Sequence, residues 1–501
     1  MKITSSKLRR LHSTANEDAL DRCEAALKLK DKGDWEGAQE IMYPLWKRVG
    51  ERPDVEGLHA SVAAEVFLSV GILTCWIGSK SQLKEAQETA KDLIGESINF
   101  FGTIGDLKKV AAARVELAYC YWCQGALNEA RIMFNESLEK LTTQGNTRAR
   151  ALLGLAIVEW SASRYKIALG ILIDNAILFK KVTNHTTAGT YHNQLAIIFQ
   201  ELANSEKRND YLLRALSEYQ QAENHFRLAH NTVLRADVKN NVGLLLYELS
   251  RFKESREHLE QARRLTAHLR DKIGVAQIDD TRAQVFIAEK KYKDAEAVAK
   301  NAVRVLEKSG HQCLLADALI THGIALARLK RTEQAQFTFQ KAIEVAHQVS
   351  ALNKAGLAAL TMIEEIDELA PETLYVAYDR ASEWLAQSQS QDLLLRVNAA
   401  ARKVFSKLGG EPKSEAEGTE DTIEALLNKP CDLPTEVLKF EGSVIREALA
   451  KANGSLTRAA ALLSMSYQAL AYILESRHKD LLKERSPIRR RSRKPAATEE
   501  R

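Results

Sequence analysis

Glycine and proline are scarce in this chain, which has 24 Gly and 8 Pro among 501 residues. Both residues disfavour helices, whereas Ala, Leu, Glu, Lys and Arg, which favour them, are abundant. The scarcity argues against a loop-rich or strand-rich protein, and we expect an all-α fold with very little strand. At this length the chain is either several domains or one extended repeat array.

Long apolar runs are also missing. The most apolar stretch, Val62–Ile77, contains Glu65 and is shorter than the roughly 20 residues that cross a bilayer, so it predicts a buried helix. The first twenty residues have no continuous apolar core, which argues against a secretory signal. The six cysteines are scattered, as is typical of reduced thiols. We therefore expect a cytoplasmic protein with no membrane partner.

Motifs for catalysis or cofactor binding are absent as well. The segment Gly78–Ser81 resembles only the end of a nucleotide-binding loop, and neither a zinc-protease histidine pair nor a nucleophile elbow occurs. Cys120 and Cys123 have metal or redox spacing, but they lack a second pair, so a packing role is favoured. We expect no catalytic residue, no metal and no cofactor, and an enzyme is the third hypothesis.

A three-residue pattern recurs along the first part of the chain: a small or polar residue, a large residue two positions on, and a small residue three beyond that. The copies are Gly33/Trp35/Ala38, Ser81/Leu83/Ala86, Gly125/Leu127/Ala130, Ser163/Tyr165/Ala168, Ser217/Tyr219/Ala222, Ser250/Phe252/Ser255, Lys290/Tyr292/Ala295 and Lys330/Thr332/Ala335. The pattern fits a helical hairpin, in which the first residue lies in the turn, the large one fills the gap between the helices and the small one permits close approach. Four copies continue with a large residue one helical turn later: Phe134, Phe226, Leu259 and Phe339.

These residues resemble the tetratricopeptide (TPR) repeat over roughly residues 15–350. The small residues are spaced by 33 to 54 positions instead of a strict 34, which predicts extended helices or insertions, notably around Ser205–Leu213. Helical patterning continues over 351–408, with Pro371 opening a later segment and one apolar face made by Leu357, Leu360, Ile363 and Ile366. We expect a TPR-like solenoid over 15–408, and the resemblance implies a concave surface that binds a protein, a peptide or another helix.

Positive charge is concentrated near the C-terminus. Residues 435–501 hold fourteen Lys or Arg against eight Asp or Glu, a net charge of +6, and the net of +5 for the whole chain leaves −1 for residues 1–434. Residues 409–434 are rich in Gly, Pro, Ser and acidic residues, which is typical of a linker. We expect a separate domain over 435–482 and a basic, disordered tail over 483–501.

Three short helices are predicted after the linker. The first spans 437–451, with Leu438, Val444, Ile445, Ala448 and Leu449 on one stripe, and Asn453–Gly454 ends it. The second spans 455–463 and the third 467–476, with only a tight turn between them. This spacing indicates a helix-turn-helix, in which the last helix enters the major groove of DNA.

The residues of this segment resemble the Fis-type helix-turn-helix domain. The resemblance rests on Glu441, Val444–Ile445, Ala448–Leu449, Gly454, Thr457–Arg458–Ala459–Ala460, Leu463, Met465–Ser466 and Leu470. It implies binding of double-stranded DNA, usually as a homodimer with the first helices at the interface. Transferred by position, Ser455 and Thr457 contact phosphate, and the groove is faced by Ser466, Tyr467, Gln468, Ala471 and Tyr472.

The predicted recognition helix is unusually uncharged, because family members commonly have basic residues at Tyr467 and near Ala471 and Tyr472. Gln468 can pair bidentately with adenine. Phosphate contacts would then come from Arg458, Arg477 and Lys479 and from the tail residues Arg489, Arg490, Arg491, Arg493 and Lys494. The alternatives are a solvated tail without a partner and, for Arg458, an ordinary helix-surface charge.

Two functional hypotheses follow from these patterns. The favoured one is a bacterial transcriptional regulator or nucleoid-associated protein, whose C-terminal domain binds DNA and whose repeats bind a protein, peptide or signal or self-associate. The alternative is a repeat scaffold in which the Fis-like domain serves dimerisation or docking instead of DNA binding.

Overall fold

The computed structural model describes residues 5–83, 85–142, 145–206, 208–386, 391–407, 433–463, 465 and 467–484. Every regular element in these ranges is a helix, which confirms the predicted all-α class. The chain forms two compact units, Met1–Val404 and Phe405–Arg501. Most of the expected linker and the tail beyond Glu484 lie outside the described residues.

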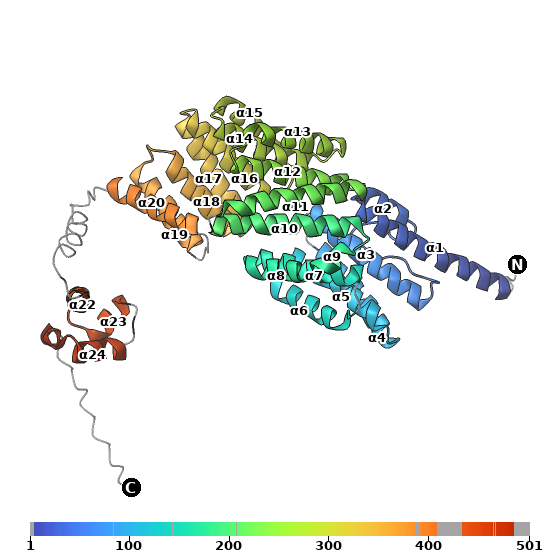
Figure 1. Ribbon diagram of the computed structural model, residues 1–501, viewed down its shortest axis with the longest axis horizontal. Helices are drawn as coiled ribbons and strands as arrows, with labels where there is room; N and C mark the ends of the chain where they lie inside the picture. The colour runs from blue at the N-terminus through green and yellow to red at the C-terminus, as the bar shows by residue number, and fades with distance from the viewer. Residues whose placement is uncertain are drawn as a thin grey trace, which may run out of the picture. The chain divides into compact units, whose positions relative to one another are not determined.

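The first unit is a row of antiparallel helical hairpins (Figure 1), in which each hairpin packs on the next. The nine hairpins among its described residues are α1 (Ser5–Asp31) with α2 (Trp35–Met42), α3 (Ala60–Lys80) with α4 (Ala86–Thr103), α5 (Leu107–Cys123) with α6 (Leu127–Lys140), α7 (Asn146–Ser161) with α8 (Tyr165–Asp174), α10 (His185–Glu206) with α11 (Asn209–Leu228), α12 (Thr232–Glu248) with α13 (Phe252–His268), α14 (Lys272–Ala288) with α15 (Tyr292–Leu306), α16 (Gln312–Arg328) with α17 (Thr332–Gln348), and α18 (Leu352–Glu365) with α19 (Pro371–Leu385). The short α9 (Ala176–Lys180) precedes α10, and α20 (Gln391–Lys407) follows α19. Pro371 begins α19, as its position in the sequence predicted.

Left-handed turn residues set the length of the repeat. Between α11 and α18 they recur every 20 positions, at His230, Ser250, Arg270, Lys290, Gly310, Lys330 and Ser350. A helix of about 17 residues and a three-residue turn account for this spacing, since a residue with positive φ closes the last helical turn. The hairpin repeat here is therefore 40 residues, longer than the TPR unit that the sequence resembles.

The structure confirms some of the eight predicted copies of the hairpin pattern in full and others only in part. All eight small residues are buried, and six of the eight first residues adopt positive φ in a turn. Ser217 is a wrong assignment, because α11 runs through it as one continuous helix. Ser81 precedes the left-handed residue, which is Gln82, and Leu83 is exposed and does not fill the gap between helices.

Helix α3 contains the apolar stretch of the sequence. Among the described residues it is the one helix long and apolar enough to cross a membrane, and 56% of its most apolar window is buried inside the fold. It packs against α1, α4 and α5. Its apolar side chains therefore form core, as the interruption by Glu65 suggested.

The N-terminal hairpin also contacts helices much later in the chain. The Thr186 hydroxyl and the Asn231 side-chain amide both donate hydrogen bonds to the Asp31 carbonyl, at 2.7 and 3.0 Å. The Lys80 ammonium lies 3.3 Å from the Asp271 carboxylate. The superhelix thus curves until α1 and α3 meet the first turns of α10, α12 and α14.

The second unit contains α22 (Leu433–Lys451), α23 (Leu456–Leu462), α24 (Tyr467–Ser476) and the 3-10 helix η1 (Lys479–Glu484). Its core is built by residues that all four elements or their turns contribute: Ile445, Ala448, Leu449, Ala452, Leu456, Ala459, Ala460, Leu470, Leu474 and Leu481. Two features of the prediction are wrong. Helix α22 begins four residues before Val437, and Leu438 and Val444 are exposed instead of lying on the inward stripe.

Candidate nucleic-acid interface

Two tight turns orient the helices of the second unit. Asn453 and Gly454 adopt left-handed φ values of 51° and 74°, and the Gly454 amide donates to the Leu449 carbonyl at 2.8 Å. This closes α22 and leaves only four residues between the end of α22 and the start of α23. Between α23 and α24, the Met465 amide donates to the Ala460 carbonyl at 3.0 Å and its side chain packs on the core.

Helix α24 is anchored along one face and exposed along the other. Leu470 and Leu474 are fully buried in the core of the unit. On the opposite side, Tyr467 is 45% exposed, Tyr472 is 69% exposed and Gln468 is exposed. A phenol, an amide and a second phenol are therefore presented at the surface of α24.

The other predicted contact residues differ in how far their side chains are exposed. Thr457 and Arg458 are exposed on α23, whereas Ser455 is half-buried at the N-terminal end of the helix. Ala471 is half-buried and packs on the core, so only part of its side chain faces outward. Ser466 and the five basic tail residues Arg489, Arg490, Arg491, Arg493 and Lys494 lie outside the described residues.

Positive charge is placed beside α24 and not on it. Helix α24 contains no Lys or Arg. Arg458, Arg477 and Lys479 are exposed around it, although an Arg477 nitrogen also lies 3.5 Å from the Glu441 carboxylate. The described part of the unit therefore has exposed cations around the outward face of α24, and the charged side chain on α24 itself is the exposed, acidic Glu475.

A partly buried hydrogen bond between His478 and Glu441 connects the end of the unit to α22, and no sequence pattern indicated this pairing. His478 Nε2 lies 3.0 Å from a Glu441 carboxylate oxygen, and the imidazole is almost fully buried. A Cβ at Gly442 would lie 3.1 Å from the same ring, so the glycine makes room for it. The two partners are 37 residues apart, which is why local periodicity could not pair them.

The cysteine pattern in α5 has a structural role. Cys120 is fully buried and lies in a small core cluster with Cys75 of α3. Hydrogen bonding among the thiols and burial raise the pKa of Cys123 well above its usual range, which disfavours the reactive thiolate. The five described cysteines are free, and no group of three metal-ligating side chains occurs in the described ranges.

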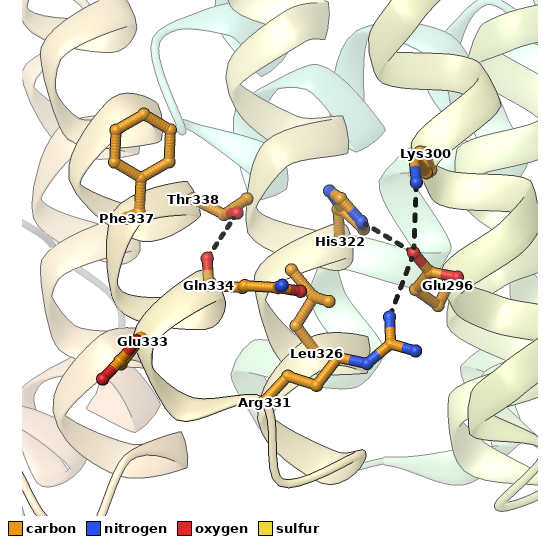
Figure 2. Close-up of a pocket in the computed structure, with 9 residues that line it drawn as sticks. All are labelled: Glu296, Lys300, His322, Leu326, Arg331, Glu333, Gln334, Phe337 and Thr338. Atoms are coloured by element: carbon orange, nitrogen blue, oxygen red, sulfur yellow. Dashed lines mark hydrogen bonds and ion pairs between the residues drawn. The ribbon is translucent and has the colours of Figure 1, made fainter.

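The repeat array carries a polar groove on α15, α16 and α17 (Figure 2). Glu296 is the common partner of three basic side chains, with a carboxylate oxygen 3.7 Å from His322 Nε2, 3.7 Å from an Arg331 nitrogen and 4.0 Å from Lys300 Nζ. Burial lowers the pKa of His322. Phe337, 68% exposed, supplies an apolar contact at the rim. Such a mixture suits a peptide or protein surface, and the sequence pattern did not point to it.

Comparison with known proteins agrees with both units. Residues 437–475 match the family described as Bacterial regulatory protein, Fis family. Among solved structures, a Rap protein complexed with Competence and Sporulation Factor is similar, with 14% identity, 77% of this chain and 99% of that chain covered, and a TM-score of 0.50. The apo form of the quorum sensor NprR from B. thuringiensis is 14% identical over 72% of this chain and 97% of that chain, with a TM-score of 0.49. No curated protein is significantly similar to this chain.

At such low identity the structural likeness shows the fold alone. Within the C-terminal unit, residues 437–475 match a Fis-type helix-turn-helix, and the N-terminal unit is a TPR-like helical-repeat array. Both predicted resemblances are thereby confirmed.

Proposed function

We propose that this protein is a DNA-binding transcriptional regulator or nucleoid-associated protein. The observation that carries the proposal is the match of residues 437–475 to a regulatory family, together with the outward face of α24, where Tyr467, Gln468 and Tyr472 are exposed. Gln468 reads base edges, and Tyr472 contacts the groove beside it. Arg458, Arg477, Lys479 and the basic tail contact phosphate.

Dimerisation is the second element of the proposal. Leu438 and Val444 on α22 remain 39% and 38% exposed, outside the core of the unit. Exposed aliphatic side chains on the first helix suit a helix-to-helix contact with a second copy. A homodimer would present two α24 helices to two half-sites of a DNA duplex.

The repeat array supplies the input of this regulator. It binds a protein, a peptide or a small signal, and the groove around Glu296 and Phe337 is one surface with suitable chemistry. The regulator acts in the cytoplasm at the nucleoid, without enzymatic activity. Fluorescence microscopy of a tagged chain tests that location by its overlap with stained DNA.

The decisive experiment is fluorescence anisotropy of labelled duplex DNA titrated with the full chain at several salt concentrations. We expect binding that weakens steeply with salt, because counterions are released from each neutralised phosphate. The double variant Gln468→Ala/Tyr472→Ala should lose selectivity among sequences. An absence of DNA binding at low salt would refute the proposal.

An adaptor function is the second candidate, because α24 has two exposed tyrosines and no basic residue. Surfaces rich in tyrosine and poor in lysine are typical of protein interfaces. Stable protein partners in a pull-down, combined with no association with chromatin, would favour this alternative.

A further inference from the structure

A pocket lies where the N-terminal hairpin meets later helices of the first unit. The turn between α1 and α2 forms one wall, and the opposite walls come from α5, α7, α10 and α12. Hydrogen bonds from Thr186 and Asn231 to the Asp31 carbonyl hold the turn in place. We call this cavity of about 280 Å³ the closure pocket.

Aromatic side chains dominate its lining. Three of the six tryptophans of the chain line it, Trp35 from α2, Trp76 from α3 and Trp122 from α5, together with Tyr119. The Trp76 ring lies 5.7 Å from the Tyr119 ring and 6.4 Å from the Trp122 ring. Flat aromatic walls of this kind favour a planar apolar ligand.

The charged groups that line the closure pocket, and several of its polar groups, already have partners within the protein. The Arg150 guanidinium lies 2.6 Å from the Glu116 carboxylate, and Lys30 Nζ lies 2.8 Å from an Asp31 carboxylate oxygen. The Thr190 hydroxyl donates to the Thr186 carbonyl, and the Asn231 side-chain oxygen accepts from the Leu234 amide. A charged ligand, or a peptide backbone with many polar groups, would therefore be desolvated without new partners.

We propose that the closure pocket binds a small, uncharged aromatic molecule of about two fused rings. The volume supports this size, since an apolar cavity of roughly 150 Å³ holds benzene and the closure pocket is nearly twice as large. The balanced ion pairs support the absence of net charge. This inference names the chemical class of the small signal that the repeat array is proposed to bind, and it rests on that proposed function.

Binding there would also tie the N-terminal hairpin to the rest of the superhelix. Asp31 and Trp35 come from the N-terminal hairpin, whereas Thr186 and Asn231 come from helices more than 150 residues later. A ligand that contacts both sides stabilises the closed arrangement by its binding free energy. A bound ligand would thus make the N-terminal hairpin more rigid.

The test is isothermal titration calorimetry of the full chain, without DNA, with two probes of the same shape. They are 2-naphthamide, which is neutral, and 2-naphthoate, which is anionic. We expect 2-naphthamide to bind at least 10-fold more tightly and to slow amide hydrogen exchange around residues 29–37 and 184–191. Failure of both probes to bind at millimolar concentration, or tighter binding of 2-naphthoate, would overturn the proposal.

Variants locate the site. Ile157→Trp, which fills the closure pocket from α7, and Trp35→Leu, which removes one aromatic wall, should each weaken 2-naphthamide binding at least 10-fold. Trp384→Leu, on α19 and away from the pocket lining, should leave it unchanged. Equal binding by all folded variants, judged by circular dichroism, would place the probe elsewhere and refute the assignment. Because DNA is absent from these titrations, their failure is distinct from a failure of DNA binding.

Discussion

The Phe226 ring lies directly against Gly189, so that a Cβ at position 189 would stand 2.6 Å from a ring carbon. The same relationship pairs Gly243 with Leu259 and Gly323 with Phe339, each time between the first and second helices of one hairpin. The large residue of the second helix therefore enters a space that only a glycine on the first helix leaves open.

Gly189→Ala should destabilise the array by about 1–3 kcal/mol, because Phe226 is almost fully buried and its ring has no room to move. Urea unfolding followed by circular dichroism measures the change. Gly95→Ala is the matched control, since that glycine is also inside a helix but a methyl group added there would have no neighbouring atom within 4 Å. The control should gain roughly 0.5–1 kcal/mol from helix propensity. Equal effects of the two substitutions would contradict the packing explanation.

Lys290→Gly should stabilise the hairpin of α14 and α15. Lys290 has a φ of 60°, a left-handed conformation that costs a residue with a Cβ about 1–2 kcal/mol. Glycine removes that strain at some cost in unfolded-state entropy, for an expected net gain of about 0.5–1 kcal/mol. Lys293→Gly, at an exposed position inside α15, should instead lose about 1 kcal/mol. Thermal unfolding of the two variants checks the opposite signs.

Asp280→Asn should raise stability at neutral and alkaline pH. Burial on α14 is the main cause that raises the pKa of Asp280 from 3.8 to about 6. Between these pH values the folded chain retains a proton that the unfolded chain has lost, so stability falls as pH rises through that window. The variant should gain roughly 1–3 kcal/mol at pH 8 and nothing near pH 3. Urea unfolding at pH 8 and at pH 3 measures the difference in stability. The control variant Glu344→Gln, at an exposed position, should not gain stability at pH 8 relative to pH 3.

Substitutions on α24 should change the selectivity of DNA binding, whereas substitutions on α23 should change its overall affinity. Gln468→Ala should reduce discrimination among duplexes by about 1–3 kcal/mol at the affected base pair. Arg458→Gln should weaken all duplexes alike and lower the salt slope by about one. Lys293→Gln removes the same charge from the repeat array and should change neither quantity. An Arg458→Gln chain with an unaltered salt slope would make that residue an ordinary surface charge.

Val444→Glu should convert a dimer into a monomer if α22 forms the interface. A carboxylate placed among apolar side chains of two copies would lose its hydration without gaining a partner. Analytical ultracentrifugation measures the mass, and Ala450→Glu adds the same charge at another exposed position of α22. A dimer that survives Val444→Glu but not Ala450→Glu would place the interface elsewhere on the helix.

Local patterns in the sequence were sufficient to predict most helices and to identify the two family resemblances. All eight small residues are buried. Their burial could be predicted because it depends on their spacing from a turn within a single hairpin. The third helix of the C-terminal unit has the predicted bounds, Tyr467–Ser476. Short-range periodicity failed at Ser217, where a polar residue inside a long helix matches the pattern of a turn.

Only the tertiary structure decided which distant residues meet. The pairing of His478 with Glu441 and the approach of Asp31 to Thr186 and Asn231 depend on the angles between packed helices. The curvature of a solenoid is the sum of small rotations between successive hairpins, and no single hairpin sequence encodes that sum. The amino-acid sequence alone therefore determined the helices, most of the turns and the family resemblances. The closure pocket and the exposed face of α24 arise from the way those helices pack.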